Sequence, residues 1–344
     1  MKAIVIHGPK DLRISDRAVA PPGDGQVLVD VGAGGICGSD LHYYHDGGFG
    51  TVRVREPMVL GHEVAGTVAA VGAGVGRVGP GDRIAINPSR PCHGCVYCRE
   101  AKYNHCLNMR FYGSAMPFPH IQGAFQQQLL VDEQQCVPVG TEASVNEAAL
   151  SEPFSVALHA LRQAGPLAGK HVLVTGCGPI GALCAVAARY YGALTVTITD
   201  IVSSPLAVAR TLGVDEAIDV AAEPERLERY AAGKGHFHVV VEASGAQPAI
   251  EAALRVIRPR GTLVQVGVGG NVTLPLGAIV SREVEIRGSF RFHEEFEWAA
   301  SLIASRRVDL SPLISGVFPV QDAIAAFEQA SDRARAMKVQ IAFQ

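Results

Sequence analysis

The sequence predicts an α/β protein in which a β-rich domain is joined to a domain built on a doubly wound parallel sheet. The chain of 344 residues exceeds the size at which one hydrophobic core usually keeps growing, which favours two domains of roughly 150 residues each. The pattern also changes near residue 154, where short β-like runs give way to apolar runs that alternate with helix-length segments. Such alternation implies a parallel sheet with crossover helices.

Residues 1–150 contain short β-like runs separated by glycine and proline, without long helical periods. The runs are "KAIVIH", "GQVLVDV", "EVAGTVAAVG", "GDRIAI" and "QQQLLV". This spacing is typical of a barrel-like or sandwich-like domain. The tail after residue 292 adds two helical stretches, "EEFEWAASLIASRRV" and "VQDAIAAFEQASDR", and a final strand, "MKVQIAFQ".

The middle of the chain alternates predicted strands with predicted helices. The strands are "HVLVTG", "LTVTITD", "HVVVEASG" and "TLVQVGVGG", and the first two are each followed by a helix, "PIGALCAVAARYYG" and "SSPLAVARTLG". We find no internal repeat. The strands are short and apolar, as expected for strands covered by helices on both faces of the sheet.

Composition and charge narrow the class of protein. Hydrophobic residues make up 48% and charged residues 18% of the chain, and the 30 basic and 33 acidic residues are intermixed to a net charge of −3. This balance supplies no positive surface for nucleic acid. The apolar stretch at the start is too short for a signal peptide, and no run of 18 apolar residues occurs, so we expect neither secretion nor membrane insertion but a cytoplasmic location.

A glycine-rich loop follows the strand "HVLVTG". Gly176, Gly178 and Gly181 stand in G-x-G-x-x-G register at the start of a helix, with Pro179 and Ile180 between them. The three glycines suit a tight turn, the close approach of backbone to a pyrophosphate, and close helix packing, in that order. Proline at the first helical position costs no hydrogen bond. The loop predicts a dinucleotide site, although an ordinary tight turn between strand and helix would look similar.

An acidic residue supports the dinucleotide interpretation. Asp200 ends the next strand, nineteen residues after Gly181, where a carboxylate can accept hydrogen bonds from the adenosine ribose and repel a 2′-phosphate. The following residues 201–204 include Ser203 and Ser204 but no arginine that could hold such a phosphate. The sequence therefore favours NAD over NADP.

Eight cysteines in a chain without an export signal point to free thiols or metal ligands rather than disulfides. Cys92, Cys95, Cys98 and Cys106 follow the pattern C-x2-C-x2-C-x7-C, in which two short loops can wrap four thiolates around one zinc ion and leave no open position. An iron–sulfur cluster also uses four thiolates, but its usual spacings differ. Four unliganded thiols are the remaining alternative.

A second set of residues could form a zinc site with an open position. Cys37, His62, Glu63 and Glu152 lie on separate segments, and a thiolate, an imidazole and a carboxylate are a mixed ligand set for zinc. Three protein ligands would leave the fourth position for water or substrate. Each residue also has a simpler interpretation, Cys37 as a small buried side chain, His62 as a hydrogen-bonded histidine and Glu152 as a helix cap.

Several motifs together resemble one known family. G-H-E-x2-G-x5-G-x2-V at Gly61–Val75, C-G-S-D at Cys37–Asp40, the four-cysteine loop, "SEPFSVALHA" and "GSFRF" at Gly288–Phe292 occur in this order. They resemble the zinc-containing medium-chain alcohol and polyol dehydrogenases over essentially the whole chain. Within that family, "AINPSRPC", "MRFYGSAMPFPH" and "LVQVGVGG" most resemble the branch that acts on polyols and sugar acids.

The resemblance implies a fold, an assembly and a set of ligands. It implies a GroES-like catalytic domain of residues 1–153 and 293–344, a Rossmann dinucleotide-binding domain of residues 154–292, and a homodimer or homotetramer associating near "LVQVGVGG" and "VEIRGSF". It also implies one catalytic and one structural zinc. Cys37 and His62 match catalytic zinc ligands, and Glu63 and Glu152 both match carboxylates near the ion, so the third direct ligand stays open.

The family also implies an oxidoreductase mechanism. Zinc would lower the pKa of a secondary alcohol as a Lewis acid, and NAD would accept the hydride. Ser39 matches the residue that accepts the alcohol proton and passes it through the cofactor ribose towards His42.

Three residues are substrate candidates. Tyr43 and Arg291 match an aromatic residue and an arginine beside the polyol site, and Arg110 is a further candidate for a substrate carboxylate. Sorbitol, xylitol, threonine or a simple alcohol are alternative substrates. The rival classes are a zinc-free reductase using NADPH and a non-catalytic, RNA-associated zinc protein.

Overall fold

The structure is a computed structural model that describes all residues 1–344, and it divides into two compact units. The first unit comprises Met1–Glu152, Phe296–Asp332 and Lys338–Gln344. The second comprises Pro153–Glu295 and Arg333–Met337. The short segment Arg333–Met337 therefore groups with the second unit, whereas the sequence assigned the whole tail to the first domain. No helix is both long enough and apolar enough to cross a membrane.

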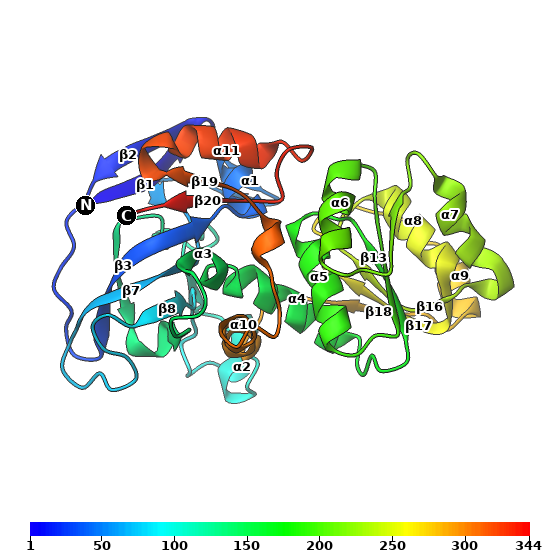
Figure 1. The fold of residues 1–344 in the computed structure, drawn as a ribbon, viewed down its shortest axis with the longest axis horizontal. Coiled ribbons are helices and arrows are strands. Elements are labelled where there is room, and N and C mark those ends of the chain that lie inside the picture. The colour runs from blue at the N-terminus through cyan, green and yellow to red at the C-terminus, as the bar shows by residue number, and fades with distance from the viewer. The chain divides into compact units, whose positions relative to one another are not determined.

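The first unit is β-rich, and its main sheet has seven strands (Figure 1). Its strands are β1 (Lys2–Gly8), β2 (Asp11–Asp16), β3 (Gln26–Gly35), β4 (Gly48–Phe49), β5 (Val52–Arg53), β6 (Met58–Val59), β7 (Glu63–Val71), β8 (Arg83–Ile86), β9 (Ser89–Arg90), β10 (Arg110–Phe111), β11 (Gln128–Asp132), β12 (Cys136–Pro138), β19 (Ile314–Pro319) and β20 (Lys338–Ala342). Its helices are α1 (Gly38–Asp46), α2 (Val96–Arg99), α3 (Val145–Ala148), α10 (Glu295–Ala304) and α11 (Ala323–Ser331), and α4 (Ser151–Gln163) starts at its boundary.

Strand β3 organises the part of this sheet that carries the candidate site. The strand order is β12-β8-β7-β3-β20-β19, and β11 also pairs with β3. At the carboxyl end of β3, Gly35 lies opposite Glu63 of β7 and Gln340 of β20, both in antiparallel register. A Cβ atom on Gly35 would lie 2.3 Å from Glu63 Oε2, so glycine leaves the space that the carboxylate occupies.

The second unit is a parallel α/β domain, as the alternating pattern predicted. Its elements are β13 (His171–Thr175), α5 (Pro179–Tyr190), β14 (Thr195–Asp200), α6 (Ser203–Thr211), β15 (Glu216–Asp219), α7 (Pro224–Glu228), β16 (Phe237–Glu242), α8 (Gln247–Val256), β17 (Ile257–Gln265), α9 (Leu276–Ser281) and β18 (Glu285–Gly288). The strand order is β15-β14-β13-β16-β17-β18, and every pair is parallel. Helices α5 and α6 cover one face, and α7, α8 and α9 lie on the other (Figure 1).

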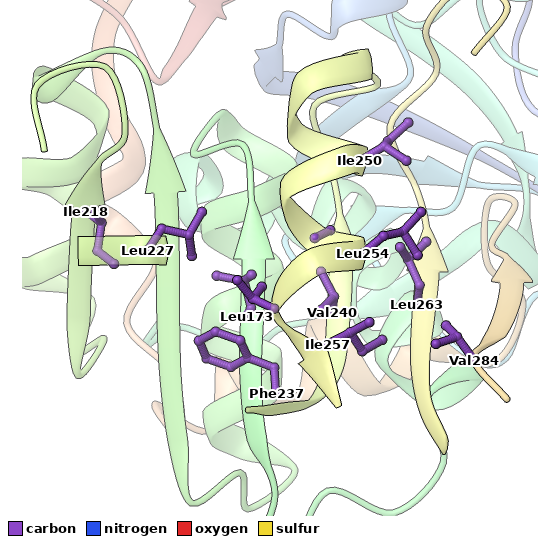
Figure 2. Close-up of a cluster of buried hydrophobic side chains, with 12 residues drawn as sticks. Leu173, Ile218, Leu227, Phe237, Val240, Ile250, Leu254, Ile257, Leu263 and Val284 are labelled. Carbon is purple, nitrogen blue, oxygen red and sulfur yellow. The ribbon is translucent and has the colours of Figure 1, made fainter. Parts of the chain in front are cut away.

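Helix α8 packs its apolar face on the sheet of the second unit. Ile250 and Leu254 of this helix lie against Leu173, Val240 and Leu263 of three neighbouring strands (Figure 2). All five side chains are at most 2% exposed. Burial of an aliphatic side chain of this size stabilises the folded state by about 1.5–3 kcal/mol. This packing holds β13, the strand that the glycine-rich loop follows, in the sheet.

Candidate metal and cofactor sites

Cys37, His62 and Glu63 meet in the first unit, with ligand atoms all within 4.8 Å of one another. Cys37 directly precedes α1, Glu63 begins β7, and His62 immediately precedes Glu63. Gly61 immediately before them has a φ of 88°, and a Cβ atom there would lie 2.0 Å from the ring of Phe125. The G-H-E motif therefore needs its glycine to bring the imidazole and the carboxylate to the thiol.

The surroundings of this cluster suit a divalent cation. Burial, together with the neighbouring Glu63, raises the pKa of the Cys37 thiol to about 12. Burial likewise raises the pKa of Glu152 to about 8, with Glu63 and Cys37 adding to the shift and His62 opposing it. Buried anionic ligands are stabilised by a bound cation. The buried Nδ1 of His62 has no hydrogen-bond partner, so this donor set fits zinc.

Asp40 links the two segments that carry Cys37 and His62. Its carboxylate accepts a hydrogen bond from the Cys37 amide at 3.1 Å and another from the Gly61 amide at 3.2 Å. The side chain is fully buried. Asp40 therefore ties the segment that carries the thiol to the segment that carries the imidazole.

Lys338 is a site residue that the sequence did not predict. Its Nζ donates to Glu63 Oε1 at 2.8 Å, to Oε2 at 2.7 Å and to the carbonyl of Ile36 at 3.1 Å. These bonds use all three donors of the ammonium group, and the side chain is only 3% exposed. Lys338 and Glu63 are 275 residues apart. The one available signal was a charged residue in the largely apolar strand "MKVQIAFQ".

The four-cysteine loop forms a second cluster, with all four sulfur atoms within 4.8 Å of one another. The Cys92 amide donates to Cys106 Sγ at 3.1 Å, and Asn108 Nδ2 donates to Cys92 Sγ at 3.5 Å. Hydrogen bonds from Asn108 and from the Gly94 amide lower the pKa of Cys92 to about 6, whereas burial raises that of Cys98 to about 12. Donors directed at sulfur stabilise thiolates, so this cluster also fits zinc.

Helix α1 carries the predicted proton relay and one substrate candidate. Ser39 and His42 are three residues apart and share one face of the helix. The His42 side chain is 56% exposed, with Nδ1 3.4 Å from Asp46 Oδ2. Tyr43 is buried, and its hydroxyl accepts a hydrogen bond from the Ala115 amide at 3.1 Å.

The two arginine candidates lie in different units. Arg110 is exposed on β10, opposite Arg90, and the next residue, Phe111, packs on His62 with ring centroids 5.4 Å apart. Because successive strand residues point in opposite directions, Arg110 is directed away from His62. Arg291 belongs to the second unit, where its guanidinium lies 5.1 Å from the ring centre of Phe290. Of the two, Arg110 is the weaker candidate for the substrate carboxylate.

The glycine-rich loop has the geometry that its spacing predicts. Gly176 has a φ of 88°, and a Cβ atom on Gly181 would lie 1.8 Å from the carbonyl oxygen of Gly176. No atom lies within 4 Å of where a Cβ of Gly178 would be. Gly178 caps α5, Pro179 opens it, and both, like Ile180, are partly exposed. The loop therefore presents open backbone at a helix N-terminus, which suits a pyrophosphate.

Asp200 stands at the end of β14 but is less available than the sequence suggested. Its side chain is only 2% exposed. One carboxylate oxygen accepts the amides of Ile201 and Val202, and the other accepts the amide of Cys177 in the glycine-rich loop. The carboxylate therefore holds the loop and the strand end together.

Two family domains match the chain. Residues 23–141 match the alcohol dehydrogenase GroES-like domain, and residues 179–305 match the zinc-binding dehydrogenase domain. The chain is 39% identical over 343 residues to L-idonate 5-dehydrogenase (NAD(P)(+)) of Escherichia coli (strain K12), covering 99% of this chain and 98% of that protein. It is 38% identical to sorbitol dehydrogenase of Gallus gallus, covering 95% of this chain and 92% of that protein.

A solved structure gives the same result. The crystal structure of L-idonate 5-dehydrogenase from Escherichia coli str. K-12 superposes with a TM-score of 0.95 at 38% identity, covering 99% of this chain and 97% of that chain. The predicted GroES-like and Rossmann-type architecture and the enzyme class are thereby confirmed, against the alternative of an RNA-associated zinc protein. The chain belongs to the zinc-containing medium-chain alcohol and polyol dehydrogenases.

Proposed function

We propose that the protein interconverts a secondary alcohol of a sugar acid and the corresponding ketone, with L-idonate and 5-keto-D-gluconate as its substrate pair and NAD as hydride carrier. The observation that carries the proposal is the buried cluster of Cys37, His62 and Glu63 in a chain that is similar over 99% of its length to an L-idonate dehydrogenase. The similarity to sorbitol dehydrogenase supports a polyol dehydrogenase of the sorbitol or xylitol type as the second candidate.

The cluster would hold the catalytic zinc. Cys37 and His62 are two ligands, and we propose Glu152 as the third, because both oxygens of Glu63 accept hydrogen bonds from Lys338. When bound there, zinc supplies a Lewis acid that lowers the pKa of the substrate hydroxyl. Asp40 keeps the two ligand-bearing loops in place through their amides.

Proton removal is the task of helix α1. As the Ser39 hydroxyl takes up the proton of the substrate alcohol, it would release its own proton towards His42, which lies on the same face of the helix, is exposed to solvent and would pass the proton to water. The amide of Ser39 donates a hydrogen bond to the sulfur of Cys37, which opposes the rise in the thiol pKa. One turn of helix thus supports both a metal ligand and the proton path.

The four-cysteine cluster would hold a second, structural zinc. Four thiolates complete a tetrahedral coordination sphere and leave no position for substrate. The loop around the cluster contains only the short helix α2 and a 3-10 turn at Tyr103–His105, so little other regular structure holds it. The proposed role of this ion is to stabilise the loop.

The substrate proposal is tested by measuring NAD+ reduction with a panel of alcohols. We expect L-idonate to be oxidised with a higher kcat/KM than sorbitol, xylitol, L-threonine or ethanol, because the chain is 39% identical over 99% of its length to a sugar-acid dehydrogenase. D-gluconate serves as the control sugar acid with a different configuration. If only the neutral polyols were oxidised, the proposed mechanism would still hold, but the protein would be a polyol dehydrogenase of the sorbitol or xylitol type.

We also propose that two copies associate through strand β18. This strand has a hydrogen-bonded neighbour on one side only and is exposed along its length. Large apolar side chains are exposed beside it, among them Val268 (89%), Val280 (74%) and Leu276 (67%). A free sheet edge next to exposed apolar side chains is typical of an interface. Two-fold symmetry would pair the two β18 strands.

This association predicts the effect of a single charge. Val280→Glu is expected to convert the oligomer to a smaller species, because it places a carboxylate in the proposed apolar interface. Light scattering coupled to size-exclusion chromatography measures the mass. Val317→Glu, at an exposed position of strand β19 in the first unit, is the matched control and should leave the mass unchanged. An unchanged mass for both variants would rule out this interface.

A further inference from the structure

The carboxylate at the end of β14 has no acceptor site left for a ribose hydroxyl. Asp200 Oδ1 accepts the Ile201 amide at 2.7 Å and the Val202 amide at 3.0 Å, and Oδ2 accepts the Cys177 amide at 2.6 Å. The fourth donor is the guanidinium of Arg333, at 3.3 Å from Oδ2. A carboxylate offers about four acceptor sites, so a ribose hydroxyl must displace one donor, and the longest bond is that from Arg333.

Arg333 brings a cation that the local sequence lacks. It lies 133 residues from Asp200 along the chain, in the short segment Arg333–Met337 that groups with the second unit. Its side chain is 61% exposed, whereas that of Asp200 is 2% exposed. A guanidinium has five donors, and this exposure leaves donors available to a ligand at the edge of the site.

The neighbouring residues favour an anion at the same place. Ser203 and Ser204 open helix α6 and are exposed, and the preceding residue, Val202, provides no side-chain cap for the first amides of the helix. Hydroxyl groups and uncapped amides at a helix N-terminus bind phosphate. The charge of Asp200 is countered by Arg333 and by three backbone amides, so its repulsion of a phosphate is reduced.

We propose that Arg333 is a specificity-determining residue that binds the 2′-phosphate of NADP, so that the protein accepts NADP as well as NAD. With NAD, the hydrogen bond from Arg333 to Asp200 Oδ2 breaks, and the ribose 2′-hydroxyl donates to Oδ2 in its place. With NADP, the guanidinium turns to the phosphate, for which arginine provides paired, charge-assisted hydrogen bonds. The inference rests on the proposed function, because it requires the dinucleotide to lie on the Gly176–Gly181 loop.

The test measures the binding of NADH and of NADPH directly, in the absence of any alcohol substrate. Binding is detected by the change in fluorescence of the reduced nicotinamide. The wild-type protein is expected to bind both with dissociation constants within about tenfold of each other. Arg333→Ala is expected to weaken NADPH binding by roughly tenfold or more and to leave NADH binding unchanged or tighter. Arg335→Ala is the matched control, because it removes the same charge from an exposed position two residues away, and it should affect neither.

Competition with 2′-AMP and 5′-AMP isolates the phosphate position. Arg333→Ala should weaken competition by 2′-AMP only. Equal weakening of NADH and NADPH by Arg333→Ala would overturn the inference, as would NADPH binding by the wild-type protein that is more than about a hundredfold weaker than NADH binding. Failure of the wild-type protein to bind either nucleotide would instead contradict the proposed function, so the two failures are distinguishable.

Discussion

Cys37→Ala is expected to abolish alcohol oxidation and to remove one zinc ion while the four-cysteine cluster keeps its own. The sulfur of Cys37 lies within 4.8 Å of the ligand atoms of His62 and Glu63, and its loss leaves the catalytic ion with an incomplete ligand set. A metal ion supplies several kcal/mol of charge stabilisation to such a reaction, so kcat/KM should fall by about three orders of magnitude. Elemental analysis should show about one zinc per chain in place of about two.

The control for this variant is another cysteine replaced by alanine. Cys184 is fully buried in α5 of the second unit, and Cys184→Ala should lower stability modestly and leave zinc content and kcat/KM near those of the wild-type protein. A Cys37→Ala protein that kept its full zinc content and its activity would show that the cluster in the first unit is not the catalytic centre.

Lys338→Met is expected to give the largest loss of stability among single changes around the site. The lysine and Glu63 form a buried ion pair with side chains 3% and 1% exposed. Removal of one partner leaves a buried charge without compensation, which typically costs about 3–5 kcal/mol. Chemical denaturation of the metal-free and zinc-loaded protein measures the loss, and the rate of zinc release to a coloured chelator shows whether the ligands are also disturbed.

The double variant Lys338→Met with Glu63→Gln distinguishes the loss of stability caused by the unpaired charge from the loss caused by altered packing. Because a neutral amide no longer requires a counter-charge, the double variant should regain much of the stability that Lys338→Met loses. Glu63→Gln alone should retain the catalytic zinc, whereas Glu152→Gln should lose it. Loss of zinc from Glu63→Gln and not from Glu152→Gln would make Glu63 the direct ligand.

The sequence predicted the architecture because the patterns that carry it are local. The apolar runs of β13, β14 and β16, and the helices between them, stand out by length and spacing, and a strand–helix alternation allows few topologies. Strand β15 was not predicted, and β18 was expected only from the family resemblance, as a sheet edge near "VEIRGSF". Their sequences, "EAID" and "EIRG", are short and charged, because they flank the sheet and bury less apolar surface than its central strands.

Two residues of the sites could not be predicted because they act over long distances in the chain. Lys338 reaches Glu63 only because β20 pairs with the end of β3 beside β7. Arg333 reaches Asp200 only because a five-residue segment of the tail, Arg333–Met337, groups with the second unit. Residues 201–204 contain no arginine, which favoured NAD over NADP. That local pattern could not show that Arg333, from a distant part of the chain, lies on Asp200.

The most direct test of the central claim is NAD+ reduction with L-idonate, measured with zinc quantified on the same sample before and after chelation. We expect about two zinc ions per chain, activity that falls as the first-unit ion is removed, and recovery when zinc is restored. Full zinc content with no activity on L-idonate or any other alcohol would contradict the proposed zinc-dependent oxidation.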